Sequence, residues 1–259
     1  MTASRKVLFF SLGLLCSLPS TRAASKLIQT SNAEGQALAA ELRSLKPAEN
    51  LEIKATLKIR DGNGKRTTVP FRYQIVVGST SWQSIYETQN GVRTPAEKLV
   101  VVHSDSQPNR YLHSQPGGPG GAVAQPVSLT GDKTMVPFVN SNFWLADLGL
   151  EFLQWPEQRV VEEAKIKMRK SRPCKVLESI NPHPGAIGYT RVRSWIDSEN
   201  HAVILAEAYG PEGKMIKEFE VGGVTKVNGR YEPKDVEMRD VRTDSQTTLE
   251  FKYEEKPSE

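Results

Sequence analysis

Alternating apolar and polar positions dominate the chain and predict strands. From Leu51 to Arg60 every second residue is apolar, which is typical of a half-buried strand with a charged outer face. Asp61-Gly62-Asn63-Gly64 follows as a hairpin turn, because Asn-Gly and Asp-Gly accept the left-handed backbone that tight hairpins need. After a return strand, further strands are predicted at 71–77, 82–87 and 98–103. The first half of the chain is therefore predicted to contain an antiparallel meander.

The second half repeats this pattern almost without interruption. The predicted strands are 160–168, 174–180, 189–196, 201–209, 215–221, 223–228, 230–233, 235–242 and 247–253. Their connections are short, whereas parallel neighbours need crossovers of about a dozen residues or more. The sheet is therefore antiparallel, and a meander this long is expected to curl into a barrel or part of a barrel.

Two stretches have helical spacing instead. Ser31 and Glu34 form a capping-box pattern, leucines then recur every three or four residues, and Pro47 ends the run. Between Ser141 and Trp155 a second apolar stripe has the same spacing. Gly149 lies inside it and costs about 1 kcal/mol of helix propensity, so one helix and two short helical turns remain alternatives. This stripe must be buried, and the concave face of the curled sheet is the expected place.

Residues 104–140 differ in composition and are rich in Ser, Gln, Pro and Gly. The glycine run at 117–121 lacks the Lys-Ser/Thr that a phosphate-binding loop needs after its last glycine. We predict a long loop inserted in the domain, with one short strand near Tyr111. A loop of this length in a compact domain is often a lid or a binding segment.

Residues 1–23 have the features of a secretory signal peptide. Arg5 and Lys6 precede an apolar run at 7–18, and Thr21-Arg22-Ala23 places small residues at a cleavage site. The alternative is an uncleaved N-terminal anchor, although the run is short for the ~30 Å of a membrane core. Its removal would leave Cys174 as a single cysteine, which excludes an intramolecular disulfide. A small buried hydrophobe is the preferred interpretation of Cys174, since a catalytic thiol needs a histidine nearby.

Charge and motifs exclude several classes of function. The formal net charge is +4, and Arg5, Lys6 and Arg22 of the predicted leader supply most of it, so a nucleic-acid partner is not expected. None of the four histidines has a zinc-binding spacing, and nucleophile-elbow and Rossmann motifs are absent. We predict no catalytic residue, no metal and no cofactor. The basic run Lys165–Arg172 is interpreted as a solvated strand and turn, or as a contact with an anionic membrane surface.

The second half of the chain contains a series of distinctive segments: 142–148, 151–156, 174–177, 189–197, 206–209, 213–214, 217–219 and Met238. This series resembles the outer-membrane lipoprotein-sorting family, the LolA-like proteins. The opening helix and the hairpin at 51–77 also look like that family, and the match is to an uncharacterised branch of it. The resemblance implies an α+β, mostly β fold: an incomplete antiparallel β-barrel with short helices packed over the concave side. It makes residues 24–259 a single LolA-like domain, with 104–140 as an insertion that has no counterpart.

The resemblance also implies a carrier that holds lipid acyl chains between the sheet and its helices, without a cofactor. Candidate lining residues share large apolar or aromatic side chains: Trp82, Phe143, Trp144, Leu148, Phe152, Trp155 and Trp195. Each of them could equally be part of the core, because a sheet covered by helices needs the same residue types.

The leading hypothesis is therefore an exported, periplasmic, non-enzymatic carrier of a lipid or of a lipoprotein acyl chain. An envelope protein that accepts the ligand and a peripheral membrane contact are further expected partners. The alternatives are a ligand-free envelope interaction or structural protein and, with less support, an envelope hydrolase that uses carboxylates brought together by the fold.

Overall fold

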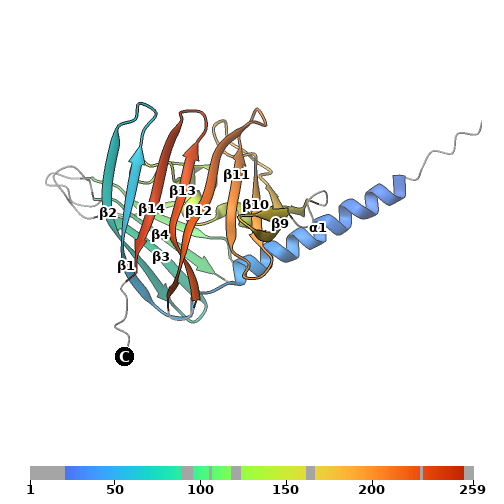
Figure 1. The fold of residues 1–259 in the computed structure, drawn as a ribbon, viewed down its shortest axis with the longest axis horizontal. Helices are drawn as coiled ribbons and strands as arrows, with labels where there is room; N and C mark the ends of the chain where they lie inside the picture. The colour runs from blue at the N-terminus through green and yellow to red at the C-terminus, as the bar shows by residue number, and fades with distance from the viewer. Residues whose placement is uncertain are drawn as a thin grey trace, which may run out of the picture.

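One large antiparallel sheet forms the body of the protein (Figure 1). The computed structural model describes residues 21–88, 96–104, 107–117, 124–161, 167–227 and 230–253. The strands are β1 (Leu51–Arg60), β2 (Arg66–Val77), β3 (Ser81–Thr88), β4 (Lys98–Ser104), β5 (Arg110–Ser114), β6 (Val127–Leu129), β7 (Glu157–Val160), β8 (Lys167–Arg169), β9 (Arg172–Ile180), β10 (Arg191–Asp197), β11 (Val203–Tyr209), β12 (Met215–Val227), β13 (Arg230–Asp240) and β14 (Ser245–Lys252). The helices are α1 (Thr21–Ser44), α2 (Leu145–Leu148) and the 3₁₀ turns η1 (Gly131–Thr134) and η2 (Glu151–Gln154).

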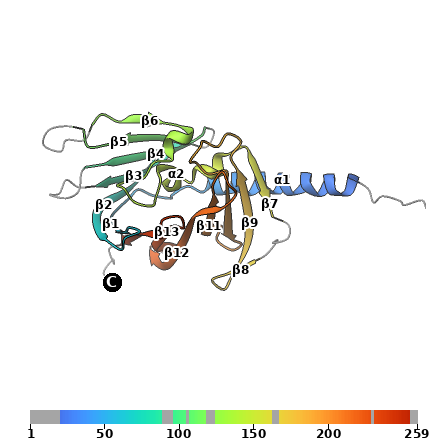
Figure 2. The same cartoon turned by 90° about the horizontal axis from the view of Figure 1, so that it is seen from above.

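The strands follow each other in the order β6-β5-β4-β3-β2-β1-β14-β13-β12-β11-β10-β9-β7, and β8 pairs with β9. The first and last strands of the chain are neighbours in the middle of the sheet: β1 pairs with β14, with Leu57 opposite Leu249. Figure 2 shows the sheet bent around α2, with β3 and β4 on one side and β11 and β13 on the other. β6 and β7 remain end strands, so the sheet is unclosed over the described residues. The predicted fold class, an incomplete antiparallel barrel with short helices, is confirmed.

Several predicted strands have different bounds. The pairs 215–221 with 223–228 and 230–233 with 235–242 are continuous, as β12 and β13. A bulge at Gly222 and Gly223 explains the error, because glycines that suggested a break instead let the strand bend without leaving the sheet. The strand predicted at 160–168 is divided between β7 and β8, and residues 162–166 lie outside the described part.

The segment predicted as a long loop contains more structure than expected. The strand near Tyr111 is β5, which pairs with β4, and β5 in turn pairs with β6. β6 has only three residues, too few for a periodic pattern to reveal it. The clear alternation predicts the strands as far as β4, and β5 and β6 extend this side of the sheet by two more strands. Most of the glycine run lies outside the described residues.

The first helix begins at Thr21, so the prediction that Ser31 caps it is wrong. Ser31 is buried in the helix interior, where its Oγ donates a hydrogen bond of 2.5 Å to the carbonyl oxygen of Val160. Gly35 lies so close to β7 that a side chain there would overlap the backbone of Arg159. The helix therefore docks against the end strand through its small residues. No helix in the described ranges is both long enough and apolar enough to cross a membrane.

The stripe at 141–155 forms two short turns rather than one helix. α2 ends at Leu148 with Gly149 as its C-cap, and Leu150 then adopts a left-handed backbone with φ of 49° before η2 begins. A left-handed conformation is unfavourable for a leucine, so the packing of both turns must hold it. The chain thereby places α2 inside the hollow of the sheet and η2 nearer to α1 (Figure 2).

Buried apolar residues form two clusters on the concave side and one on the opposite face of β9 and β10. The first joins α1 and η2 to the later strands, and the second fills the space among the early strands and the 138–145 segment. The third is small and contains Cys174 and Trp195. Cys174 is fully buried there, as its interpretation as a small hydrophobe predicts.

Candidate functional site

Residues 142–155, which we call the lid, cover the concave face of the sheet, and side chains of the sheet and of α1 donate hydrogen bonds to their backbone. Tyr86 of β3 donates to the Leu148 carbonyl oxygen at 3.2 Å, and Asn109 of the β4–β5 connection donates to that of Gly149 at 2.7 Å. From α1, Arg43 Nη1 donates to the Leu153 carbonyl oxygen at 2.6 Å. The buried Gln158 donates to the Phe152 carbonyl oxygen at 2.9 Å. These side-chain hydrogen bonds hold residues 148–153, while the start of the lid is anchored by the buried side chains of Phe143 and Leu145 and by their backbone hydrogen bonds to Phe138 and Val136.

One of these ties depends on a carboxyl group. Tyr111 donates its hydroxyl proton to Glu151 Oε2 at 2.9 Å. Burial raises the pKa of Glu151 to about 6, although the Tyr111 hydrogen bond opposes the shift. The ionised carboxylate of Glu151 is thus disfavoured when the lid is closed, and protonation of Glu151 favours the closed lid.

Replacing Glu151 by glutamine is expected to raise the free energy of unfolding by up to about 2 kcal/mol above pH 6 and to change it little at pH 4.5. The folded pKa lies above the unfolded value of 4.5, so the folded state binds the extra proton between these values. Wild-type stability from this group is therefore full only below pH 4.5 and is lost as the pH rises through 6. Urea unfolding of both proteins from pH 4.5 to 7.5 measures the difference, and a gap independent of pH contradicts the assignment.

A buried lysine lies beneath α2. Lys217 of β12 is 1% exposed, and its Nζ donates to the Asn142 carbonyl oxygen at 2.7 Å and contacts Asp147 Oδ2 at 3.4 Å. Its ammonium group also lies 3.6 Å from the ring centroid of Trp144, which stacks on Tyr189. Burial lowers the pKa of Lys217 to about 8, and Asp147 opposes the shift.

Asp147 holds this cluster together. It accepts hydrogen bonds from the Tyr189 hydroxyl at 2.9 Å and from the Trp144 backbone N–H at 2.8 Å, at the start of α2. A carboxylate of the lid is therefore the counter-ion of a cation of the sheet. Sequence analysis missed this pair, but a signal existed: Lys217 shares the phase of Phe219 and Val221, so alternation places a charge on the apolar face.

A small cavity adjoins the pair. Its volume is about 20 Å³, enough for about one water molecule. Apolar residues of β10 to β13 form its wall on the sheet side, which we call the floor: Val192, Val203, Ala206, Ala208, Phe219 and Met238. The lid contributes Asp147, Leu150 and Phe152, and Lys217 and Tyr189 complete the lining. With the lid closed, this space cannot hold an acyl chain.

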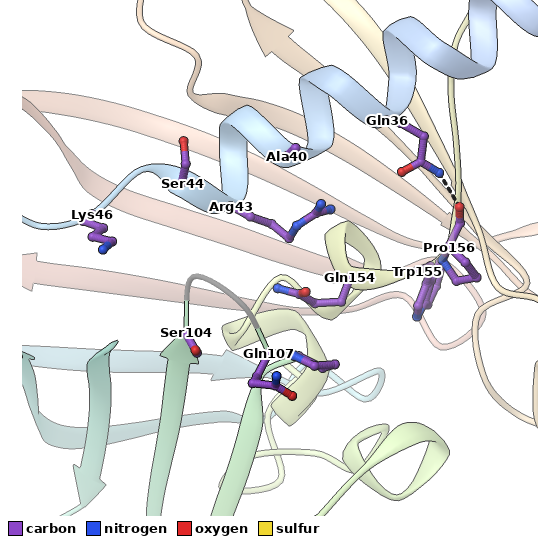
Figure 3. A pocket seen from close by; sticks show the side chains of 11 residues that line it. Gln36, Ala40, Arg43, Ser44, Lys46, Ser104, Gln107, Gln154, Trp155 and Pro156 are labelled. Atoms are coloured by element: carbon purple, nitrogen blue, oxygen red, sulfur yellow. Dashed lines mark hydrogen bonds between the residues drawn. The ribbon is translucent and has the colours of Figure 1, made fainter. Parts of the chain in front are cut away.

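A larger open groove of about 600 Å³ lies on the other side of the lid, between α1 and the β4–β5 connection. Figure 3 shows Arg43, Gln107 and Gln154 around it, from α1, the β4–β5 connection and η2. Trp155 forms part of its wall, and Gln36 donates a hydrogen bond to the Pro156 carbonyl oxygen. Hydrogen-bond donors and one aromatic ring thus line the groove.

Residues 150–155 separate the two spaces. Leu150 and Phe152 line the cavity, and Gln154 and Trp155 line the groove. η2 is a single turn that follows the left-handed Leu150, so this segment lines both spaces without being part of the sheet.

The predicted lining residues do not all meet in one place. Phe152 lines the cavity, Trp155 the groove, and Trp144 packs on Lys217 next to the cavity. Phe143 and Leu148 pack in the core of the early strands. The remaining two, Trp82 and Trp195, are further away.

Trp82 stacks on His103 with ring centroids 3.8 Å apart, on the early strands. Trp195 lies in the cluster on the opposite face, under the guanidinium of Arg169 at 5.0 Å, so its placement on the concave side is wrong. Arg191 and Arg193 share its phase in β10, and this pattern already indicates the outer face.

Two polar clusters among the described residues are closed to solvent or paired within the protein. Ser84 Oγ lies 2.8 Å from His103 Nε2, but Ser84 is only 2% exposed and closed to a substrate. Buried Glu178 is held by Arg159 and Arg193, whose hydrogen bonds keep its pKa low although burial opposes this. No group of three or more possible metal ligands occurs among the described residues.

The basic run forms the hairpin of β8 and β9. Lys170 pairs with Glu220 at 2.5 Å and Arg172 with Asp197 at 2.6 Å, so part of its charge is neutralised within the protein. Lys165 lies outside the described residues. Contact of the basic run with a membrane surface stays a prediction.

Comparison with solved structures identifies the same fold elsewhere. A putative outer membrane lipoprotein-sorting protein domain from Vibrio parahaemolyticus superposes with a TM-score of 0.70 at 14% identity, over 85% of this chain and 91% of that one. A DUF1329 family protein from Desulfovibrio piger gives 0.69 at 16% identity, over 86% and 91%. A LolA superfamily protein from Nitrosomonas europaea gives 0.57 at 15% identity, over 88% and 95%.

Sequence comparison adds a family. No curated protein matches significantly. A family model described as an uncharacterized protein matches residues 121–256, more than half of the chain, from the segment before the lid to the last strand. The chain therefore belongs to this family of uncharacterized proteins, and its fold is that of the LolA-like, outer-membrane lipoprotein-sorting proteins.

Proposed function

We propose that the protein is an exported, non-enzymatic carrier that binds a lipidic ligand between the floor and the lid. The fold it shares with lipoprotein-sorting proteins supports this by analogy, since fold alone does not fix function. The observation that carries the proposal is the position of residues 150–155 between the apolar cavity and the open groove. Displacing this one segment creates a single space with an apolar floor and a polar mouth, the arrangement that an amphiphile requires.

The energies are compatible with ligand-driven opening. Transfer of a sixteen-carbon chain from water yields about 12 kcal/mol, at ~0.8 kcal/mol per methylene. Each hydrogen bond that holds the lid contributes ~0.5–1.5 kcal/mol net. Breaking these ties offsets part of the gain, and the ligand replaces the apolar contacts that the lid gives up. The same ties favour closure again after release, so transfer to an acceptor in the envelope remains feasible.

Export to the periplasm belongs to the same proposal. It rests on the signal-peptide pattern of residues 1–23, of which 1–20 lie outside the described part and 21–23 begin α1. A periplasmic carrier would meet lipid or lipoprotein acyl chains on one side and an accepting envelope protein on the other. No nucleotide or metal is required for exchange of this kind.

Uptake of a fluorescent sixteen-carbon fatty acid by residues 24–259, with native mass spectrometry of co-purified lipid, tests the proposal. Phe152→Glu is expected to reduce uptake at least tenfold, because it places a charge in the apolar lining, while Phe152→Leu retains most of it. Circular dichroism of both variants controls for folding. A wild-type protein that carries no lipid and takes up none would contradict the carrier and favour the ligand-free interaction protein.

A further inference from the structure

The hydrogen bonds described for the Lys217 ammonium group both end on the lid. They reach the Asn142 carbonyl oxygen at 2.7 Å and Asp147 Oδ2 at 3.4 Å, and the ring of Trp144 covers the same group at 3.6 Å. If α2 rotates when residues 150–155 are displaced, Asp147 leaves the ammonium group, whereas Asn142, which is hydrogen-bonded to Ser245 and Thr247 of β14, and Trp144 precede α2 and stay in place. The ammonium group would then face the new space without a counter-ion.

The nearest other carboxylate is already occupied. Asp240 lies opposite Lys217 in the β12–β13 register, but Arg242 holds both of its oxygens, Nε at 3.1 Å and Nη2 at 2.6 Å. Arg242 also keeps the pKa of Asp240 low, against the effect of burial. Asp240 and Arg242 thus form a neutral pair, and Asp147 is the acid that balances Lys217 in the closed state.

The surroundings of Lys217 are otherwise apolar. Among the residues that line the cavity, Lys217 and Asp147 alone carry charge, and the floor consists of Val, Ala, Phe and Met side chains. A ligand that opens the lid therefore meets an apolar surface with one fixed cation. A neutral lipid would leave that cation unpaired in a low-dielectric space, which is strongly unfavourable.

We propose that the ligand is an amphiphile with an anionic head group, whose carboxylate or phosphate takes the place of Asp147 beside Lys217 while its tail lies on the floor. This inference rests on the proposed function and specifies its ligand class. Asp147 acts in the empty protein as an internal substitute for the head group. The Tyr189 hydroxyl, which donates to Asp147 at 2.9 Å, is placed to donate to the ligand instead.

Chain-matched ligands test the head group directly. Hexadecanoic acid, hexadecyl phosphate and hexadecanol share one tail, and their affinities are compared at pH 7 by displacement of a fluorescent fatty acid or by calorimetry. We expect the wild-type protein to prefer an anionic ligand over the alcohol by about ten- to a hundredfold, the ratio that a charge-assisted hydrogen bond supplies. The carboxylate and phosphate arms show which head group fits.

Variants at both partners give opposite expectations. In Lys217→Met the acid-to-alcohol ratio is expected to fall to about one, while Lys217→Arg keeps a preference for the anion. Asp147→Asn removes the competing carboxylate and retains an acceptor, so it is expected to raise the ratio several-fold. If Lys217→Met does not fold, the Lys217→Met/Asp147→Asn double variant, which has no unpaired buried charge, takes its place.

The outcomes separate this inference from the function beneath it. Equal wild-type affinities for acid and alcohol, or a preference that survives in Lys217→Met, overturn the anionic ligand while the carrier stands. A protein that binds none of the three ligands overturns both.

Discussion

Replacing Glu97 by alanine is expected to lower the free energy of unfolding by about 3–5 kcal/mol, among the largest effects of any single change in this chain. Glu97 is 7% exposed, and its two oxygens have different partners. Oε1 lies 2.8 Å from Nε2 of the buried His113, and Oε2 accepts the backbone N–H of Val139 at 3.1 Å. Alanine leaves both groups buried without a partner and creates a cavity as well.

The second of these contacts controls a strained turn. Val139 and Asn140 have φ values of 53° and 52°, a region that a β-branched residue such as valine rarely enters. The turn inserts Phe138 between Phe71 and Tyr86, with ring centroids 6.5 Å and 6.1 Å away. Loss of Glu97 therefore also weakens the packing of the core around the early strands.

Glu97→Gln is the matched control, because it keeps the size and one acceptor but lacks the charge. Its expected destabilisation is about 1–2 kcal/mol, in the range of a weakened buried hydrogen bond. Chemical denaturation followed by tryptophan fluorescence measures both variants. Equal losses for alanine and glutamine would mean that the cavity, and not the hydrogen bonds, determines the effect.

Glu97 also illustrates why sequence alone predicts strands better than it predicts their connections. Strand positions follow from a period of two, which is visible wherever apolar and charged residues alternate, as from Leu51 to Arg60. The partners of Glu97 lie 16 and 42 positions away in the chain, and no local pattern links them. Strand β6 escaped detection for the related reason that three residues carry no period.

The predicted start of the first helix and the predicted face of the sheet for Trp195 were wrong for different physical reasons. Ser31 is a residue type that often caps helices, but its hydroxyl donates a hydrogen bond to Val160 of β7. Docking of the helix against β7 satisfies this hydroxyl better than a helix end would. Trp195 was assigned to the concave side by residue type, whereas its phase with Arg191 and Arg193 indicates the outer face. The aromatic residues of the lid were predicted from the sequence, whereas Lys217 of β12, a charge within an apolar phase, was given no role.

Replacing Lys217 by methionine is expected to lower the free energy of unfolding by about 3 kcal/mol at pH 7, because it leaves the carboxylate of Asp147 buried without its cation. The Tyr189 hydroxyl and the Trp144 N–H still donate to Asp147, which keeps the loss at the lower end of the range. Adding Asp147→Asn removes the unpaired charge and is expected to recover more than half of the stability. The double-mutant cycle yields the coupling energy of the pair.

The same substitution is expected to change the pH dependence of stability. Burial lowers the pKa of Lys217 from 10.5 to about 8, so between these values the unfolded chain holds a proton that the folded protein has released. Wild-type stability from this group is therefore smallest below pH 8 and rises above it by about 1.4 kcal/mol per pH unit. The methionine variant lacks this gain. Burial raises the pKa of Tyr189 well above its usual value, so its phenol opposes the gain only beyond pH 10.

Urea unfolding at several values between pH 7 and 9.5 isolates this window. The stability difference between the wild-type protein and Lys217→Met should widen by about 2 kcal/mol across it. A constant difference would mean that Lys217 pays no desolvation penalty under the closed lid. In that case Asp147, Asn142 and Trp144 fully compensate the desolvation of the ammonium group in the closed protein, and loss of Asp147 on opening would leave the same cation for a ligand to pair.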